Sequence, residues 1–64
     1  MRGIDIRSIL QIENGDNIRI TTIDEEEYEL PKKDMHVLGE TVELTSKQGT
    51  LYLQTEDIEK IWIM

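Results

Sequence analysis

Hydrophobic and polar residues alternate most regularly between positions 42 and 53, where a short polar turn divides the run in two. If residues 46–49 form a four-residue loop, the facing pairs are Thr45 with Thr50, Leu44 with Leu51, Glu43 with Tyr52, and Val42 with Leu53. A shift of one residue would place leucines opposite glutamate and tyrosine, so the register is well specified. We therefore predict a hairpin whose buried face carries Val42, Leu44, Leu51 and Leu53.

The C-terminal residues predict one more strand. Residues 55–57 (Thr-Glu-Asp) are typical of a polar turn, and Ile58 and Ile61 have the spacing of one short helical or 3-10 turn. Ile61 and Ile63 then alternate around Trp62, which is the pattern of a strand.

A period of two also governs the N-terminal part. In segment 4–13 the even positions Ile4, Ile6, Leu10 and Ile12 are apolar and are flanked by polar residues 5, 7, 11 and 13, which predicts a strand. Residues 14–16 (Asn-Gly-Asp) tolerate a positive φ, and residues 17–23 predict the returning strand. A loop with an odd number of residues brings Ile12 opposite Ile18, which favours three.

The middle of the chain predicts a further strand and a bend. Residues 24–27 are four adjacent carboxylates, which form a solvated turn because they cannot be buried together. Residues 28–30 begin the next strand, and Pro31 ends it or confines it to a sheet edge. After the turn 32–34 and the short apolar segment 35–38, the apolar phase changes at Gly39. A glycine at that point suggests a strand that kinks as a small barrel closes.

Composition supports one all-β domain over residues 1–64. Ten isoleucines and six threonines, with no alanine or phenylalanine, favour strands because β-branched side chains suit a pleated sheet. A chain of this size buries only about 60% of its unfolded surface, which leaves little room for a deep catalytic cleft. We predict a small five-stranded β-barrel or roll with one short helical or 3-10 turn before the last strand.

Charge and cysteine content restrict the possible partners. The net charge of −7 opposes direct binding to nucleic acid and to anionic membranes, because phosphate binding needs a basic surface. No cysteine is available for disulfides, thiolate catalysis or a Cys-type zinc site. No apolar run approaches the ~18 residues of a membrane span, and the first ten residues lack the apolar core of a signal peptide. We expect a cytoplasmic protein.

The two halves of the chain share a pattern. Residues 20–22 and 28–30, followed by Asp34-Met35 and Leu38, resemble residues 44–46 and 51–53, followed by Asp57-Ile58 and Ile61. Both halves predict strand, turn, strand, polar residues and a further apolar segment. Either a hairpin unit was duplicated, or the likeness is a coincidence in a chain built from few residue types.

Short loops and a helical turn before the last strand make the chain resemble the SH3-like and Sm-like small barrels. The closing segment LYLQTEDIEKIWI is similar to that of Sm-like and YolD-like bacterial proteins. The resemblance implies the fold and no ligand. An RNA-binding Sm-like protein presents basic and aromatic loop residues, and an SH3 domain carries an Ala-Leu-Tyr-Asp-Tyr type stretch, neither of which this chain has.

Few residues are candidates for chemistry. His36 is the only histidine and has no serine or cysteine at a recognisable spacing, so we expect no enzyme. The acidic run 24–27 lacks the alternating ligands and the glycine of an EF-hand, and no glycine-rich phosphate loop exists, so we expect no metal and no cofactor. The run is either a solvated turn or a contact for a basic partner.

Two aromatic residues lie out of phase with the predicted core and are candidates for partner contact. Either an exposed patch binds a partner, or a strongly coiled sheet buries both of its faces. The predicted partner-binding residues are Tyr52, Trp62, Ile9, Ile23, Asp24, Glu25, Glu26 and Glu27. We expect a non-enzymatic module that docks a protein partner or forms a homo-oligomer.

Two other functions stay open at this point. One is an acidic mimic that blocks a DNA- or RNA-binding protein, as some small phage-encoded inhibitors do. The other is an Sm-like RNA-binding ring, which would need a local basic surface formed by Arg2, Arg7, Arg19, Lys32 and Lys33.

Overall fold

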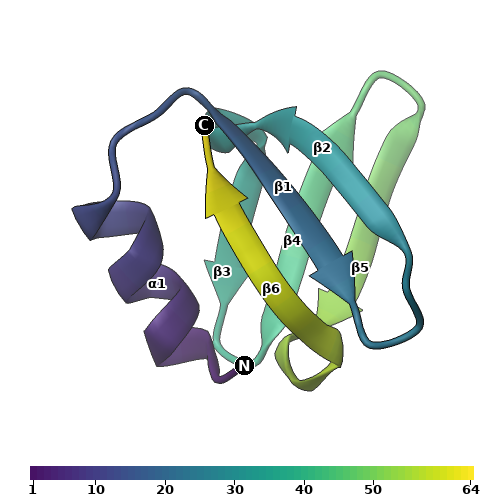
Figure 1. The fold of residues 1–64 in the computed structure, drawn as a ribbon. Helices are drawn as coiled ribbons and strands as arrows, with labels where there is room; N and C mark the ends of the chain where they lie inside the picture. The colour runs from purple at the N-terminus through teal and green to yellow at the C-terminus, as the bar shows by residue number, and fades with distance from the viewer.

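Two three-stranded antiparallel sheets form most of the molecule (Figure 1). The computed structural model describes all residues, Met1–Met64. Strands hold 52% of the residues, which confirms a mostly β fold. The elements are α1 (Gly3–Ile12), β1 (Asn17–Thr22), β2 (Glu27–Pro31), η1 (Lys32–Asp34), β3 (Met35–Leu38), β4 (Thr41–Ser46), β5 (Gly49–Gln54), η2 (Thr55–Asp57) and β6 (Ile58–Ile63). There are thus six strands and one helix, where the sequence pattern predicted five strands.

The two sheets pack through their inner faces. One sheet has the order β2-β1-β6 and the other β3-β4-β5. Alternation along β1 and β4 directs every second side chain into the space between the sheets. Full burial of each such aliphatic side chain contributes about 1.5–3 kcal/mol. The buried core consists of Ile6, Ile18, Ile20, Met35, Val42, Leu44 and Ile58.

The hairpin of β4 and β5 has the predicted register, because Leu44 faces Leu51 and Val42 faces Leu53. Its buried face is correct only in part. Val42 and Leu44 are buried, but Leu53 is half-buried and Leu51 is 40% exposed. The reason is that β5 lies at the edge of its sheet, where no further strand covers these side chains.

The predicted N-terminal strand is wrong, because Gly3–Ile12 is the helix α1. Its apolar residues fit two periods, and Gly3, Ile6 and Leu10 share one helical face. Ile6 is fully buried, whereas Ile4 and Ile12 are 65% and 75% exposed. The predicted pairing with residues 17–23 is also wrong. Strand β6 occupies that place instead, with register Ile18↔Ile63 and Ile20↔Ile61.

A 3-10 turn does precede the last strand, but it lies at η2 rather than at the Ile58 to Ile61 spacing. Ile58 already begins β6. A bulge at Thr21/Thr22 shifts the register of β1 and β6, so that Thr21 pairs with Lys60 and Thr22 with Ile58. Gly39 does not kink a continuous strand. Its φ of 65° places it in the tight turn between β3 and β4, a conformation that favours glycine.

The repeat in the sequence has a structural counterpart. Hairpin β1-β2, turn η1 and strand β3 are followed by hairpin β4-β5, turn η2 and strand β6. Each third strand pairs with the first strand of the other hairpin, so β3 joins β4 and β6 joins β1. The halves differ in register. Met35 pairs with Leu44, whereas the corresponding Ile58 pairs with Thr22, two residues beyond the counterpart of Leu44.

Candidate functional site

Two stacked sheets of three strands leave a seam on each side, where an edge strand of one sheet faces an edge strand of the other. On one side β6 and β3 meet, and α1 lies over them (Figure 1). On the other side β2 and β5 face each other, and no helix covers them. We call the first the helix-covered seam and the second the open groove.

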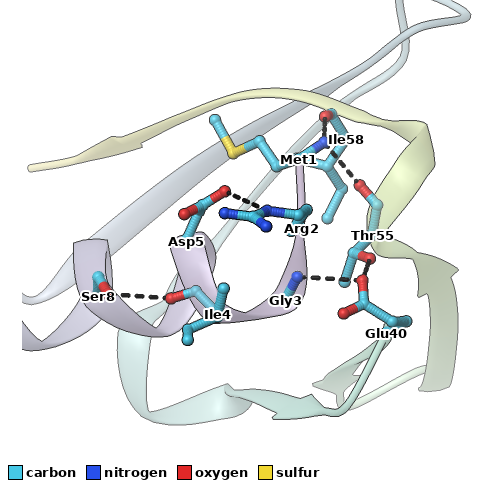
Figure 2. Close-up of polar contacts among 9 residues, drawn as sticks. All are labelled: Met1, Arg2, Gly3, Ile4, Asp5, Ser8, Glu40, Thr55 and Ile58. Atoms are coloured by element: carbon cyan, nitrogen blue, oxygen red, sulfur yellow. Dashed lines mark hydrogen bonds and ion pairs between the residues drawn. The ribbon is translucent and has the colours of Figure 1, made fainter.

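The helix-covered seam is fixed at the start of α1 (Figure 2). The Gly3 amide donates to Oε2 of Glu40 at 3.1 Å, and the hydroxyl of buried Thr55 donates to the same oxygen. These hydrogen bonds, that of Thr55 being the larger cause, lower the pKa of Glu40. A carboxylate at this position also interacts favourably with the positive end of the helix dipole. Glu40 thereby joins α1 to the β3-β4 turn and to η2.

Close packing at the same end requires a glycine. A Cβ at Gly3 would lie 2.1 Å from the carbonyl oxygen of Gly39, so no other residue fits without displacing that turn. Farther along the helix, the Arg7 guanidinium donates to the carbonyl of Val37 on β3 at 3.3 Å. Ile6 fills the seam from the helix side.

The open groove has a volume of about 470 Å³ and is lined by residues 27–30 of β2, 44–46 of β4, and 48–51 of the β4-β5 turn and β5. Its apolar lining comes from the inner faces of the two sheets. Leu44 is buried, Tyr28 and Leu30 are half-buried, and Leu51 is 40% exposed. The exposure increases toward the edge strands because nothing packs against them there.

Charge in the open groove is negative. Glu27 and Glu29 line it from β2, and no lysine or arginine is among its lining residues. Glu29 forms an ion pair with Arg19 at 2.7 Å, which leaves Glu27 as the unpaired carboxylate of the lining. Lys47 lies in the β4-β5 turn between two lining residues.

The acidic turn 24–26 continues this negative side. The Thr22 hydroxyl accepts a hydrogen bond from the Glu26 amide, and the Thr22 amide donates to the Glu26 carbonyl. Glu26 in turn accepts a hydrogen bond from the Tyr28 hydroxyl. That bond, together with desolvation and the negative charge of Glu26, raises the pKa of Tyr28. The turn is therefore an ordered acidic rim beside the groove.

The two predicted aromatic contacts do not form one patch. Tyr52 lies on the outer face of β5, where its hydroxyl donates to Glu43 at 3.3 Å. Trp62 lies on the outer face of β6, 45% exposed, with the Lys60 Nζ 5.7 Å from the centre of its ring. These outer faces belong to different sheets that pack through their opposite faces, so they point away from each other.

The other predicted residues are also dispersed. Ile9 is half-buried on α1, and Ile23 is 57% exposed in the β1-β2 turn. Of the eight predicted partner-binding residues, Glu27 alone lines the open groove. Sequence reasoning missed Tyr28, Leu30 and Leu51, because alternation assigns them to an inner face without revealing that the face is uncovered at the edge.

None of the helices is both long and apolar enough to cross a membrane. Comparison of the chain with family models, with curated proteins and with solved structures gives no match.

Proposed function

We propose that this protein is a non-enzymatic binding module that holds a segment of a protein partner in the open groove. The observation that carries the proposal is the contrast between the two seams. One is filled by α1 and held by Glu40, and the other leaves Leu51 exposed in a groove with the unpaired carboxylate of Glu27.

Covering the groove is favourable for a protein of this size. Only seven hydrophobic side chains form the buried core, and half-buried Tyr28 and Leu30 extend it to the groove, which Leu51 also lines. An aliphatic side chain of a partner placed against them removes apolar area from water at about 25 cal/mol per Å². The carboxylates of Glu27 and the acidic turn favour approach of a basic partner and raise its association rate.

The surroundings of His36 support a non-enzymatic role. Its Nδ1 lies 3.6 Å from Oε1 of Glu43, and Oε2 of the same carboxylate accepts the hydrogen bond of Tyr52. These three residues face one another across β3, β4 and β5, and the imidazole is exposed to water on the outer face. Such cross-strand pairs stabilise a sheet and exclude no water from a reacting group.

An SH3-like or Sm-like relationship is part of the same proposal. It is supported by the short connections, by η2 before the last strand, and by the return of β6 to pair with β1. The separation of β2 from β3 by η1 departs from a five-stranded barrel, since it makes six strands in two sheets.

Position-specific cross-linking in the native cell tests the function. A photoreactive amino acid in place of Gln48, which lines the open groove, should give a cross-link to one protein. The same substitution at Gln11, exposed on α1, is the matched control and should give none. Leu51→Asp should abolish the Gln48 cross-link. Cross-links from Gln11 alone, or from neither position, would contradict the proposal.

A further inference from the structure

Four strands lie at sheet edges, and three of them are protected against pairing with another chain. β2 carries Glu27 and Glu29 and ends at Pro31, which has no amide hydrogen. β3 has α1 beside it, with Arg7 bonded to the carbonyl of Val37. β6 carries adjacent charges at Glu59 and Lys60. The remaining edge strand is β5, Gly49–Gln54, which contains no charge and no proline.

The hydrogen bonds of β5 show which of its backbone groups are free. The Thr55 amide donates to the Glu40 carbonyl, so this pair is a hydrogen-bonded one. Because hydrogen-bonded pairs alternate along an antiparallel ladder, Leu53 and Leu51 direct their backbone groups to β4. The amides and carbonyls of the alternate residues point to the free edge, where no strand follows. These residues are Thr50, Tyr52 and Gln54.

We propose that an extended segment of the partner adds to β5 as an antiparallel strand inside the open groove, and that its residues alternate between aliphatic and basic. This inference rests on the proposed function. The alternation follows from the two faces of such a strand. Its inward side chains meet Leu51, Leu30 and Tyr28, which suit aliphatic residues. Its outward side chains lie beside Tyr52 on the outer face of β3-β4-β5, the face that carries Glu43 of β4, and this carboxylate suits lysine or arginine.

The direction follows from the rest of the molecule, since every strand pair in it is antiparallel and this pairing is slightly more stable per residue. A second copy of the chain is a poorer occupant. It would bring a further net charge of −7 to an already acidic surface, and its own β5 has no basic residue to place on the face that carries Glu43.

The test uses a synthetic peptide of about eight residues that alternates lysine and valine, acetylated and amidated at its ends. Bound to the isotope-labelled full chain, it should slow hydrogen exchange at the amides of Thr50, Tyr52 and Gln54. Exchange at the amides of Leu51 and Leu53 should stay as it is, because these already donate to β4. No protection at the three free-edge amides, or no binding of the peptide, would overturn the proposal.

Backbone methylation of the peptide provides the matched control. In antiparallel addition the residues with outward side chains also direct their amides to β5, so the lysine amides make the new hydrogen bonds. A peptide N-methylated at every lysine should bind at least about tenfold more weakly than one N-methylated at every valine. Equal affinities would show that the peptide does not add to β5 as a strand. The groove could still be the contact site, which the Gln48 cross-link tests separately.

Self-association is a further outcome with a clear meaning. If the amides of Thr50, Tyr52 and Gln54 become protected as protein concentration rises, without peptide, then a second copy occupies the edge. That result would overturn the assignment of the groove to a basic partner. Unchanged exchange over the same range of concentration supports it.

Discussion

The helix-covered seam and the open groove both lie between edge strands of the two sheets, but a helix covers only one of them. In both, an edge strand of one sheet faces an edge strand of the other, and the strands on the two sides occupy corresponding places in the repeated order of elements. At the helix-covered seam Ile6 is fully buried, whereas at the open groove Leu51 is 40% exposed. One seam therefore contributes to stability, and the other leaves apolar side chains partly exposed to water.

The strongest test of this comparison removes the side chain that fills the helix-covered seam. Ile6→Ala should lower the free energy of unfolding by about 2–5 kcal/mol, a large fraction of the stability of so small a domain. Ile12→Ala on the exposed face of the same helix is the control and should change it by less than about 1 kcal/mol. Urea denaturation measures both. Similar midpoints for the two variants would show that α1 does not seal the seam.

Proline substitution along β5 tests the direction of its backbone groups. Leu53→Pro removes an amide that donates to β4, so it should cost at least about 1 kcal/mol more than Tyr52→Pro, whose amide faces the free edge. The comparison is made by thermal or urea unfolding. If Tyr52→Pro proves the more damaging change, the hydrogen-bonded phase assigned to β5 is wrong.

Acid should weaken the helix-covered seam through Glu40. Its pKa is lower in the folded protein than in the unfolded chain, so its contribution is present above the unfolded pKa and is lost as pH falls through the folded pKa. Glu40→Gln should therefore flatten the loss of stability on acidification from about pH 5 downward. Glu59→Gln on β6 is the control, since it removes the same charge from an exposed side chain for which the structure shows no hydrogen bond. If both variants lose stability with pH in the same way, Glu40 does not cause the acid sensitivity.

The smallest effect on stability is expected in the open groove. Leu51→Ser should change the free energy of unfolding by less than about 1 kcal/mol, because the side chain is already partly in water. The same variant should weaken binding of the lysine-valine peptide at least about tenfold. A large loss of stability would mean that Leu51 belongs to the core and that the groove is closed in solution.

The sequence predicted well what local alternation determines. The register of β4 and β5 depends on contacts between residues close in the chain, and it was fully readable from Val42 to Leu53. The N-terminal segment was misread because its apolar residues fit a period of two as well as one helical face. In the fold, the C-terminal strand β6 pairs with β1 and so takes the place that the N-terminal segment was expected to fill.

The open groove could not be located from the sequence for a related reason. Alternation assigns Leu51 to an inner face, but whether that face is covered depends on the order of strands in two sheets. The only sign of the groove in the sequence was the absence of certain residues. β5 lacks the charges and the proline that protect β2, and this absence becomes informative only when both are known to be edge strands.

The most direct measurement compares the two seams in one sample. A water-soluble paramagnetic probe added to the methyl-labelled protein should broaden the methyl signals of Leu51 in the open groove and leave those of Ile6 under α1 sharp. Adding the lysine-valine peptide should then protect Leu51 and have no effect on exposed Ile12. Leu51 methyls as sharp as those of Ile6 in the free protein, or unprotected when the peptide is bound, would contradict an open binding groove.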